Sequence, residues 1–161
     1  MSETKKIVLI GHFGVGKTSL VRRYVDSAFS EDYLVTLGVQ VKKKTLSLDS
    51  RELNLVIWDL EGNTQVANMR ESYMLGTHGF IYVFDLTRPE TFQNLSENLS
   101  FIKEKFPDAP IEVVGNKSDL VDPNFLDEFL EKNGLDNVLV TSAKNGNNVE
   151  NVFIELATKL M

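Results

Sequence analysis

The 161-residue sequence contains no cysteine, only four prolines and no excess of positive charge. The lack of cysteine excludes disulfide bonds and thiolate metal sites, and it is typical of a reducing compartment such as the cytoplasm. A formal net charge of −6 argues against a nucleic-acid partner and against adhesion to anionic membranes, because both require clustered lysine and arginine. No apolar run approaches the length of a membrane span.

The two ends of the sequence show no targeting signal. The first residues run directly into a strand-like segment without a signal peptide, and residues 157–161 include no cysteine that could be prenylated. We therefore expect a cytoplasmic monomer without a permanent membrane anchor, unless a tail follows this sequence. The length and the 42% apolar content suit a single globular domain over residues 1–161.

Short apolar segments alternate with segments of helical periodicity, which is typical of an α/β fold with a parallel sheet. Strands are predicted at residues 5–10, 39–48, 52–59, 80–85, 111–115 and 138–141, and helices at residues 18–25, 89–106, 124–132 and 149–160. Residues 49–51 predict an antiparallel hairpin between the second and third strands. The pattern predicts a six-stranded, mostly parallel sheet with one antiparallel strand and helices on both faces. Ligands of such sheets bind at the carboxyl ends of the strands.

A glycine-rich segment follows the first predicted strand. Residues 11–18 read Gly-His-Phe-Gly-Val-Gly-Lys-Thr and match the phosphate-binding pattern G-x-x-x-x-G-K-[ST] between a strand and a helix. Its backbone N–H groups and the helix dipole favour phosphate, Lys17 supplies a positive charge, and the Thr18 hydroxyl can bind Mg²⁺. The nucleotide-binding residues assigned here are Phe13, Gly14, Val15, Gly16, Lys17, Thr18 and Ser19.

Two polar segments, residues 116–119 and 142–144, follow the fifth and sixth predicted strands. A carboxylate at Asp119 can accept hydrogen bonds from the N1–H and the exocyclic amine of guanine, whereas adenine offers no such pair of donors. One such segment is often an ordinary turn, but two at corresponding strand ends beside a phosphate loop indicate a guanine site. The residues assigned to it are Asn116, Lys117, Asp119, Ser142, Ala143 and Lys144.

These motifs closely resemble those of the small GTPases of the Ras superfamily, and the Rab and Ras branches are nearest in pattern. Residues 29–39 resemble a Rab-type switch I, and residues 58–63 stand where the family has W-D-x-A-G-Q, in a switch II of about residues 59–75. The resemblance implies a GTP-binding molecular switch that hydrolyses GTP to GDP. It also implies that effectors, exchange factors and activating proteins bind through the two switches.

The resemblance assigns roles on the base side of the site. Phe29 would pack across the guanine, and Lys117 would run along its other face. Asn116 would brace the phosphate loop, and the Ala143 N–H would meet the base carbonyl.

The resemblance also assigns roles on the phosphate side. Mg²⁺ would be held directly by the hydroxyls of Thr18 and Thr36, and through water by Asp59. Thr36 and the backbone N–H of Gly62 would contact the γ-phosphate. The residues expected to act in hydrolysis are Lys17, Thr36, Gly62 and Asn63.

Three positions depart from the family pattern. Asn63 replaces the glutamine that orients the attacking water, and its side chain is about 1.5 Å shorter. Since a displacement of ~1 Å can cost on the order of a hundredfold in rate, slow hydrolysis is expected unless switch II moves inward. Phe13 replaces a small residue, and it either shields the γ-phosphate and crowds an arginine finger or points outward against switch II or Tyr33. Glu61 replaces an alanine, and its carboxylate would either repel the γ-phosphate or pair with a lysine or arginine of a partner; nothing in the sequence decides between the two.

These departures keep a second hypothesis open, a GTP-dependent interaction module with little or no hydrolysis. A P-loop kinase is disfavoured, because the chain lacks an arginine-rich lid. His12 is expected to be structural or solvent-facing, and Asp85 to be structural. Residues 42–44 are expected to form a charged edge strand, with contact to an effector as the alternative. Trp58 and Tyr73 are either a partner-binding aromatic patch or half-buried core.

Overall fold

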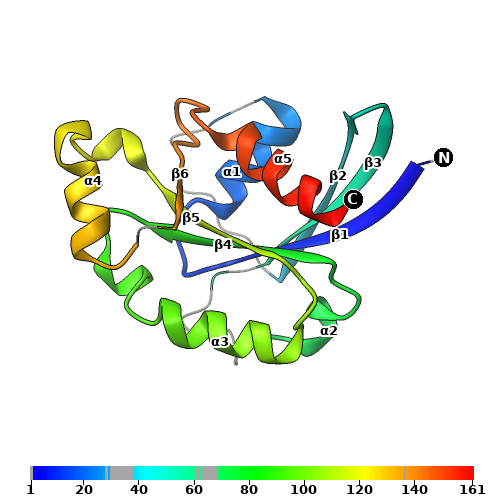
Figure 1. Cartoon of the computed structure of the whole chain (residues 1–161), viewed down its shortest axis with the longest axis horizontal. Helices are drawn as coiled ribbons and strands as arrows, with labels where there is room; N and C mark the ends of the chain where they lie inside the picture. The colour runs from blue at the N-terminus through cyan, green and yellow to red at the C-terminus, as the bar shows by residue number, and fades with distance from the viewer. Residues whose placement is uncertain (1, 28, 30–37, 61, 63–68, 136) are drawn as a thin grey trace.

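The computed structural model describes residues 2–27, 29, 38–60, 62, 69–135 and 137–161 (Figure 1). Within these ranges a six-stranded sheet has the order β2-β3-β1-β4-β5-β6. β2 is antiparallel to β3, and every other neighbouring pair is parallel, so the predicted α/β sheet is confirmed. The strands are β1 (Ser2–Ile10), β2 (Val39–Leu48), β3 (Arg51–Leu60), β4 (Gly79–Asp85), β5 (Ile111–Asn116) and β6 (Leu139–Val140).

The helices are α1 (Lys17–Asp26), α2 (Glu71–Met74), α3 (Leu95–Lys105), α4 (Pro123–Lys132) and α5 (Val149–Leu160), with 3₁₀ turns η2 (Pro89–Thr91) and η3 (Ser118–Leu120). The prediction of one helix over residues 89–106 is wrong, because this segment divides into η2 and α3. The Thr91 hydroxyl accepts a hydrogen bond from the Asp85 N–H and donates to the Arg88 carbonyl, which holds η2 against the end of β4. None of the helices in the described ranges is long and apolar enough to span a membrane.

Alternate residues of the central strand point to opposite faces of the sheet, as the period of two requires. Ile7 and Leu9 of β1 pack in one fully buried cluster with α1 and α5. Val8 and Ile10 pack in a second cluster with α2 and α3. Figure 1 shows α1 and α5 above the sheet and α2 and α3 below it, so helices cover both faces.

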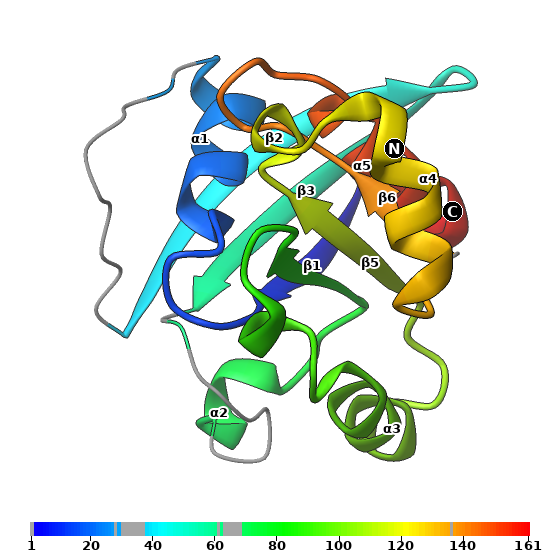
Figure 2. The same cartoon turned by 90° about the vertical axis from the view of Figure 1, so that its left-hand side faces the viewer.

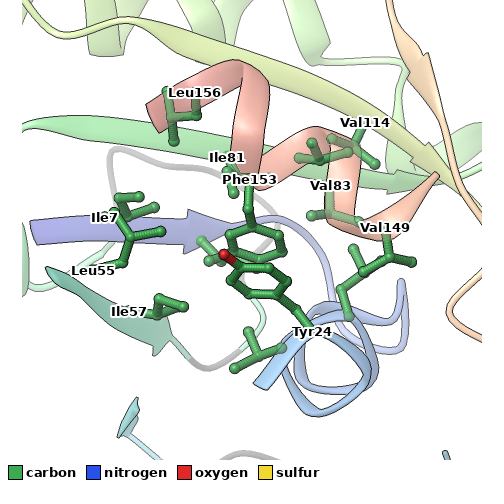
Figure 3. Packing of buried hydrophobic residues seen from close by; sticks show 14 of the residues in the cluster. Ile7, Tyr24, Leu55, Ile57, Ile81, Val83, Val114, Val149, Phe153 and Leu156 are labelled. Atoms are coloured by element: carbon green, nitrogen blue, oxygen red, sulfur yellow. The ribbon is translucent and has the colours of Figure 1, made fainter. Parts of the chain in front are cut away.

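The contact between α1 and α5 centres on two stacked aromatic rings. The rings of Tyr24 and Phe153 are parallel within 3°, with centroids 4.0 Å apart (Figure 3). Burial, reinforced by the negative charge of Glu150, raises the pKa of Tyr24 to about 12. This stack joins the helix that follows the phosphate loop to the helix that follows residues 142–148.

β2 lies at the edge of the sheet, as predicted for the segment with three consecutive lysines. The Lys42 ammonium lies 2.5 Å from an Asp26 carboxylate oxygen, and the Lys44 ammonium lies over the Tyr24 ring, 5.3 Å from its centroid. Charged side chains along an edge strand discourage pairing with another chain.

Candidate nucleotide-binding site

Five segments lie at the carboxyl-end edge of the sheet, which Figure 2 turns toward the viewer. The phosphate loop follows β1, Asp59 is the penultimate residue of β3, and Asp85 ends β4. Residues 116–119 continue from β5, and residues 142–144 follow β6. Parallel strands therefore bring together five segments that are widely separated in the sequence.

The phosphate loop approaches its neighbours so closely at two positions that only glycine fits there. Gly16 has a φ of +103°, and a Cβ atom there would lie 2.2 Å from Asn116 Nδ2. A Cβ atom on Gly11 would lie 2.2 Å from the Val83 carbonyl oxygen. Between them, the side chain of Val15 is fully buried. The loop thus rests directly on the ends of β4 and β5.

Lys17 folds back over the loop that precedes it. Its ammonium donates to the carbonyl oxygens of Gly11 at 3.0 Å and His12 at 2.8 Å. Burial lowers the pKa of Lys17 to about 8, and the negative charge of Asp59 partly opposes this shift. The loop therefore encloses a cation at the position from which the motif expects it to reach phosphate.

Two oxygen-bearing side chains, one from α1 and one from β3, contact each other. The Thr18 hydroxyl donates to Asp59 Oδ2 at 2.6 Å, and Asp59 is buried. A hydroxyl and a carboxylate are hard oxygen donors of the kind that Mg²⁺ prefers. These two residues therefore fit the magnesium role that the motif assigns to them. Ser19, the next residue, lies in the same first turn of α1.

Gly62 is buried against the tip of the phosphate loop. A Cβ atom at this position would lie 2.5 Å from both the backbone nitrogen and the Cα of Phe13. The backbone at the start of the predicted switch II thus contacts the loop directly. Thr36 and Asn63 lie outside the described residues, as do Tyr33 and Glu61.

Asn116 connects the base side of the site to the phosphate loop. Its amide nitrogen donates to the Val15 carbonyl at 3.0 Å, and its amide oxygen accepts from the Thr141 hydroxyl at 3.0 Å. The same oxygen accepts from the Ala143 N–H at 3.2 Å. The N–H that the resemblance assigns to the base carbonyl is therefore directed to Asn116 in this structure, and its role toward the base stays a prediction.

Asp119 and Ser142 form a hydrogen-bonded pair across the base side. The Ser142 hydroxyl donates to Asp119 Oδ1 at 2.8 Å and accepts from the Asn145 N–H at 3.1 Å. Ser142 is buried, whereas Asp119 is exposed. One carboxylate oxygen is thus held by the serine, which orients the group at the protein surface, and its role toward a base stays a prediction.

Lys117 is anchored by a buried carboxylate. Its backbone has a φ of +68°, and its ammonium lies 2.9 Å from Asp85 Oδ2. The other oxygen of Asp85 accepts from the backbone N–H of Thr87 at 2.8 Å and from its hydroxyl at 2.6 Å. Asp85 is therefore structural, as predicted, and it also determines where the Lys117 side chain lies.

The sequence model of the Ras family matches residues 6–161, which is almost the whole chain. This chain is a member of the Ras family. Members of the family are small GTPases that bind GTP and GDP, generally together with Mg²⁺. In general they interact with effectors, exchange factors and activating proteins.

In this Ras-family chain, two arginines contact the site without belonging to any motif. Arg23 of α1 donates to the backbone carbonyl of Ala143 at 2.8 Å. Arg88 donates to the Phe13 carbonyl at 2.9 Å and forms an ion pair with Glu90 at 3.0 Å. Sequence analysis missed both residues, because an arginine in a helix or a turn has no local feature that marks it as part of a site.

The side chains at the tip of the Ras-family phosphate loop differ in exposure. Phe13 is 51% exposed, whereas His12 is only 7% exposed, so the solvent-facing alternative for His12 is wrong. Burial lowers the pKa of His12, and the nearby charges of Arg88 and Lys17 lower it further. A buried imidazole within the loop is consistent with a structural role.

Proposed function

We propose that this chain is a GTP-binding molecular switch in which residues 1–161 form a single G domain that hydrolyses GTP slowly. The observation that carries this proposal is the bond from Asn116 to the Val15 carbonyl, 3.0 Å long. It joins the segment that would read guanine to the loop that would hold the phosphates. A nucleotide that occupied both regions would contact one connected structure.

In the proposed mechanism, water attacks the γ-phosphorus in line with the leaving oxygen of the β-phosphate. Lys17 and the loop N–H groups stabilise the negative charge that develops on the phosphate oxygens. Asn63 is the candidate that orients the water. Bound Mg²⁺ would add positive charge beside the same oxygens, and Thr18 and Asp59 are the residues described here that would hold it.

We infer that residues 29–39 and 59–75 act as the two switches and that Thr36 and Gly62 contact the γ-phosphate. The tight approach of Gly62 to the Phe13 backbone supports this inference, because switch II must reach the loop to sense the phosphate. Loss of the γ-phosphate would release both segments, as in other nucleotide switches.

A patch beside the switches supports a partner-binding surface of the Rab type. Val41 is 45% exposed and lies opposite Trp58 in the β2–β3 pairing, and the rings of Trp58 and Tyr73 are 6.4 Å apart. The Lys6 ammonium lies 3.8 Å from the centroid of the Trp58 ring. Trp58 is the only tryptophan in the chain, so its fluorescence should change when GDP is exchanged for GTP. Identical spectra of the two loaded forms would contradict a switch at this patch.

The test of the proposed reaction is single-turnover hydrolysis of preloaded GTP with Mg²⁺. We expect slow turnover by the wild type and faster turnover by Asn63→Gln, because the longer side chain brings the amide about 1.5 Å closer to the water. Asn151→Gln is the matched control, since Asn151 is an exposed residue of α5. Failure of the wild type to bind GTP would contradict the proposal entirely.

The second candidate is an interaction module that binds GTP with little or no hydrolysis. The half-exposed Phe13 at the loop tip favours it, because a phenyl group there can limit access of water or of an arginine finger. If the wild type shows near-zero turnover and Asn63→Gln or Phe13→Gly restores it, the interaction module becomes the better description, whereas wild-type turnover at the rate usual for the family would rule it out. Transfer of the phosphoryl group to a small acceptor would instead indicate a kinase.

A further inference from the structure

Arg23 lies in the last turn of α1 and reaches the segment that follows β6. Its Nε donates to the Ala143 carbonyl at 2.8 Å, and its Nη2 donates to the Lys144 carbonyl. These acceptors belong to adjacent residues about 120 positions further along the chain. The planar guanidinium presents several donors in a fixed geometry, so one side chain can hold both carbonyls at once.

Two further contacts restrict where this guanidinium can lie. Its central carbon is 5.9 Å from the centroid of the Phe29 ring. Gly146 has a φ of +78°, and a Cβ atom there would be 3.4 Å from Cδ of Arg23. The arginine therefore lies between Phe29 on one side and residues 143–146 on the other.

The loop that Arg23 holds is also attached on its other side. The backbone carbonyl of Ala143 accepts from Arg23, and the backbone N–H of the same residue donates to Asn116 Oδ1. The preceding residue, Ser142, donates to Asp119. A movement of this loop away from α1 would therefore disturb both the Ala143 N–H and the orientation of the Asp119 carboxylate.

We propose that Arg23 is a positioning residue for the guanine base. It holds residues 142–146 against α1, the helix that begins in the phosphate loop, and thereby sets the distance between the base side and the phosphate side. This inference rests on the guanine-binding function proposed above. Arg23 itself need not touch the nucleotide, because it acts through the loop and through Phe29.

The test compares Arg23→Ala with Arg22→Ala, the neighbouring arginine of the same helix, which makes neither carbonyl contact. Hydrogen bonds from a charged donor are among the stronger ones in proteins, so we expect Arg23→Ala to release a fluorescent GDP analogue about 10- to 100-fold faster than the wild type. Arg22→Ala should release it within about 2-fold of the wild-type rate. Arg23→Lys should be intermediate, because lysine has a point charge in place of the fork.

A probe without a base separates positioning from general destabilisation. The affinity of Arg23→Ala for inorganic triphosphate, which can contact only the phosphate side, should stay within about 2-fold of the wild type. Equal GDP release by the Arg22 and Arg23 variants, or a parallel loss of triphosphate affinity, would overturn the inference while leaving guanine binding intact. If the wild type binds triphosphate but not GDP, the proposed function fails, and this inference fails with it.

Discussion

The phosphate loop and the base side share one edge of the sheet, but different interactions hold them in shape. The loop is shaped by its own backbone, with Gly16 pressed against β5 and Lys17 bound to carbonyls of the preceding residues. The base side is shaped by side chains that bridge distant segments. Ser142 is bonded to Asp119, and Arg23 is bonded to the Ala143 carbonyl.

This difference indicates which contacts must change when a nucleotide binds. Lys17 and Thr18 now bond to loop carbonyls and to Asp59, and these are the groups that phosphate and Mg²⁺ would compete for. On the base side, the serine occupies one oxygen of Asp119 and can remain there. We therefore expect binding to rearrange the phosphate side more than the base side.

The largest effect is expected from Asp119→Asn, which breaks only the base side. An asparagine loses an acceptor for the guanine donors but offers a donor to the extra carbonyl of xanthine. Loss of a charged hydrogen-bond partner costs about 2–5 kcal/mol, so GDP should bind about 30- to 5,000-fold more weakly, with a gain for xanthosine diphosphate. Competition binding with both nucleotides measures this. Asp127→Asn, at an exposed position of α4, should leave the preference for GDP unchanged.

Gly16→Ala should weaken both regions together. The new methyl group would lie 2.2 Å from Asn116 Nδ2 in a residue with a φ of +103°, so the bond to Val15 must break or the loop must move. A strain of about 1–3 kcal/mol corresponds to a loss of about 5- to 150-fold in affinity for GDP and for triphosphate. Titration calorimetry with each ligand tests this. Gly134→Ala is the control, since Gly134 also has a positive φ but a methyl group there would meet no surrounding atom within 4 Å.

Arg88→Ala should affect only the phosphate side. Removal of the bond to the Phe13 carbonyl frees the loop tip, and a less well positioned tip should slow single-turnover GTP hydrolysis about 3- to 10-fold. GDP release should stay within about 2-fold of the wild type, because the base side is untouched. Arg51→Ala, at an exposed position of β3, is the control. Faster GDP release by the Arg88 variant alone would show that the two regions are not separable in this way.

The smallest effect is expected at the support that both regions share, the stack of Tyr24 on Phe153. Burial raises the pKa of Tyr24 from 10.0 to about 12, so the folded state retains the phenol proton that the unfolded state loses. This difference in pKa between the two states stabilises the folded state. Relative to high pH, the stabilisation is complete below pH 10 and is lost as the pH rises to about 12.

Tyr24→Phe keeps the stacked rings but has no phenol to ionise, so it does not lose this stability above pH 10. Its unfolding temperature should therefore fall less steeply than that of the wild type between pH 10 and 12, while GDP release at pH 8 stays unchanged. Thermal unfolding across this range provides the measurement, with Tyr73→Phe as the control. Parallel curves for the wild type and Tyr24→Phe would show that the phenol does not contribute.

The fold could be predicted because its signals are local. A β-branched run ending in Gly11 predicts β1, and helical spacing predicts α5 at Val149–Leu160, the range observed. The helix predicted over residues 89–106 failed because Thr91 bonds to Asp85, which draws the first turn out of line with α3. The strand predicted at residues 138–141 is shorter, covering Leu139–Val140.

The sequence by itself determined the class of fold, and it predicted a phosphate loop together with a guanine-reading segment. All of these depend on residue types at fixed local spacing. Only the tertiary structure decided that Arg23 holds the Ala143 carbonyl and that Asp85 anchors Lys117. These contacts join residues far apart in the chain, and the physical reason they escape sequence analysis is that their geometry exists only after the sheet has brought the strand ends together.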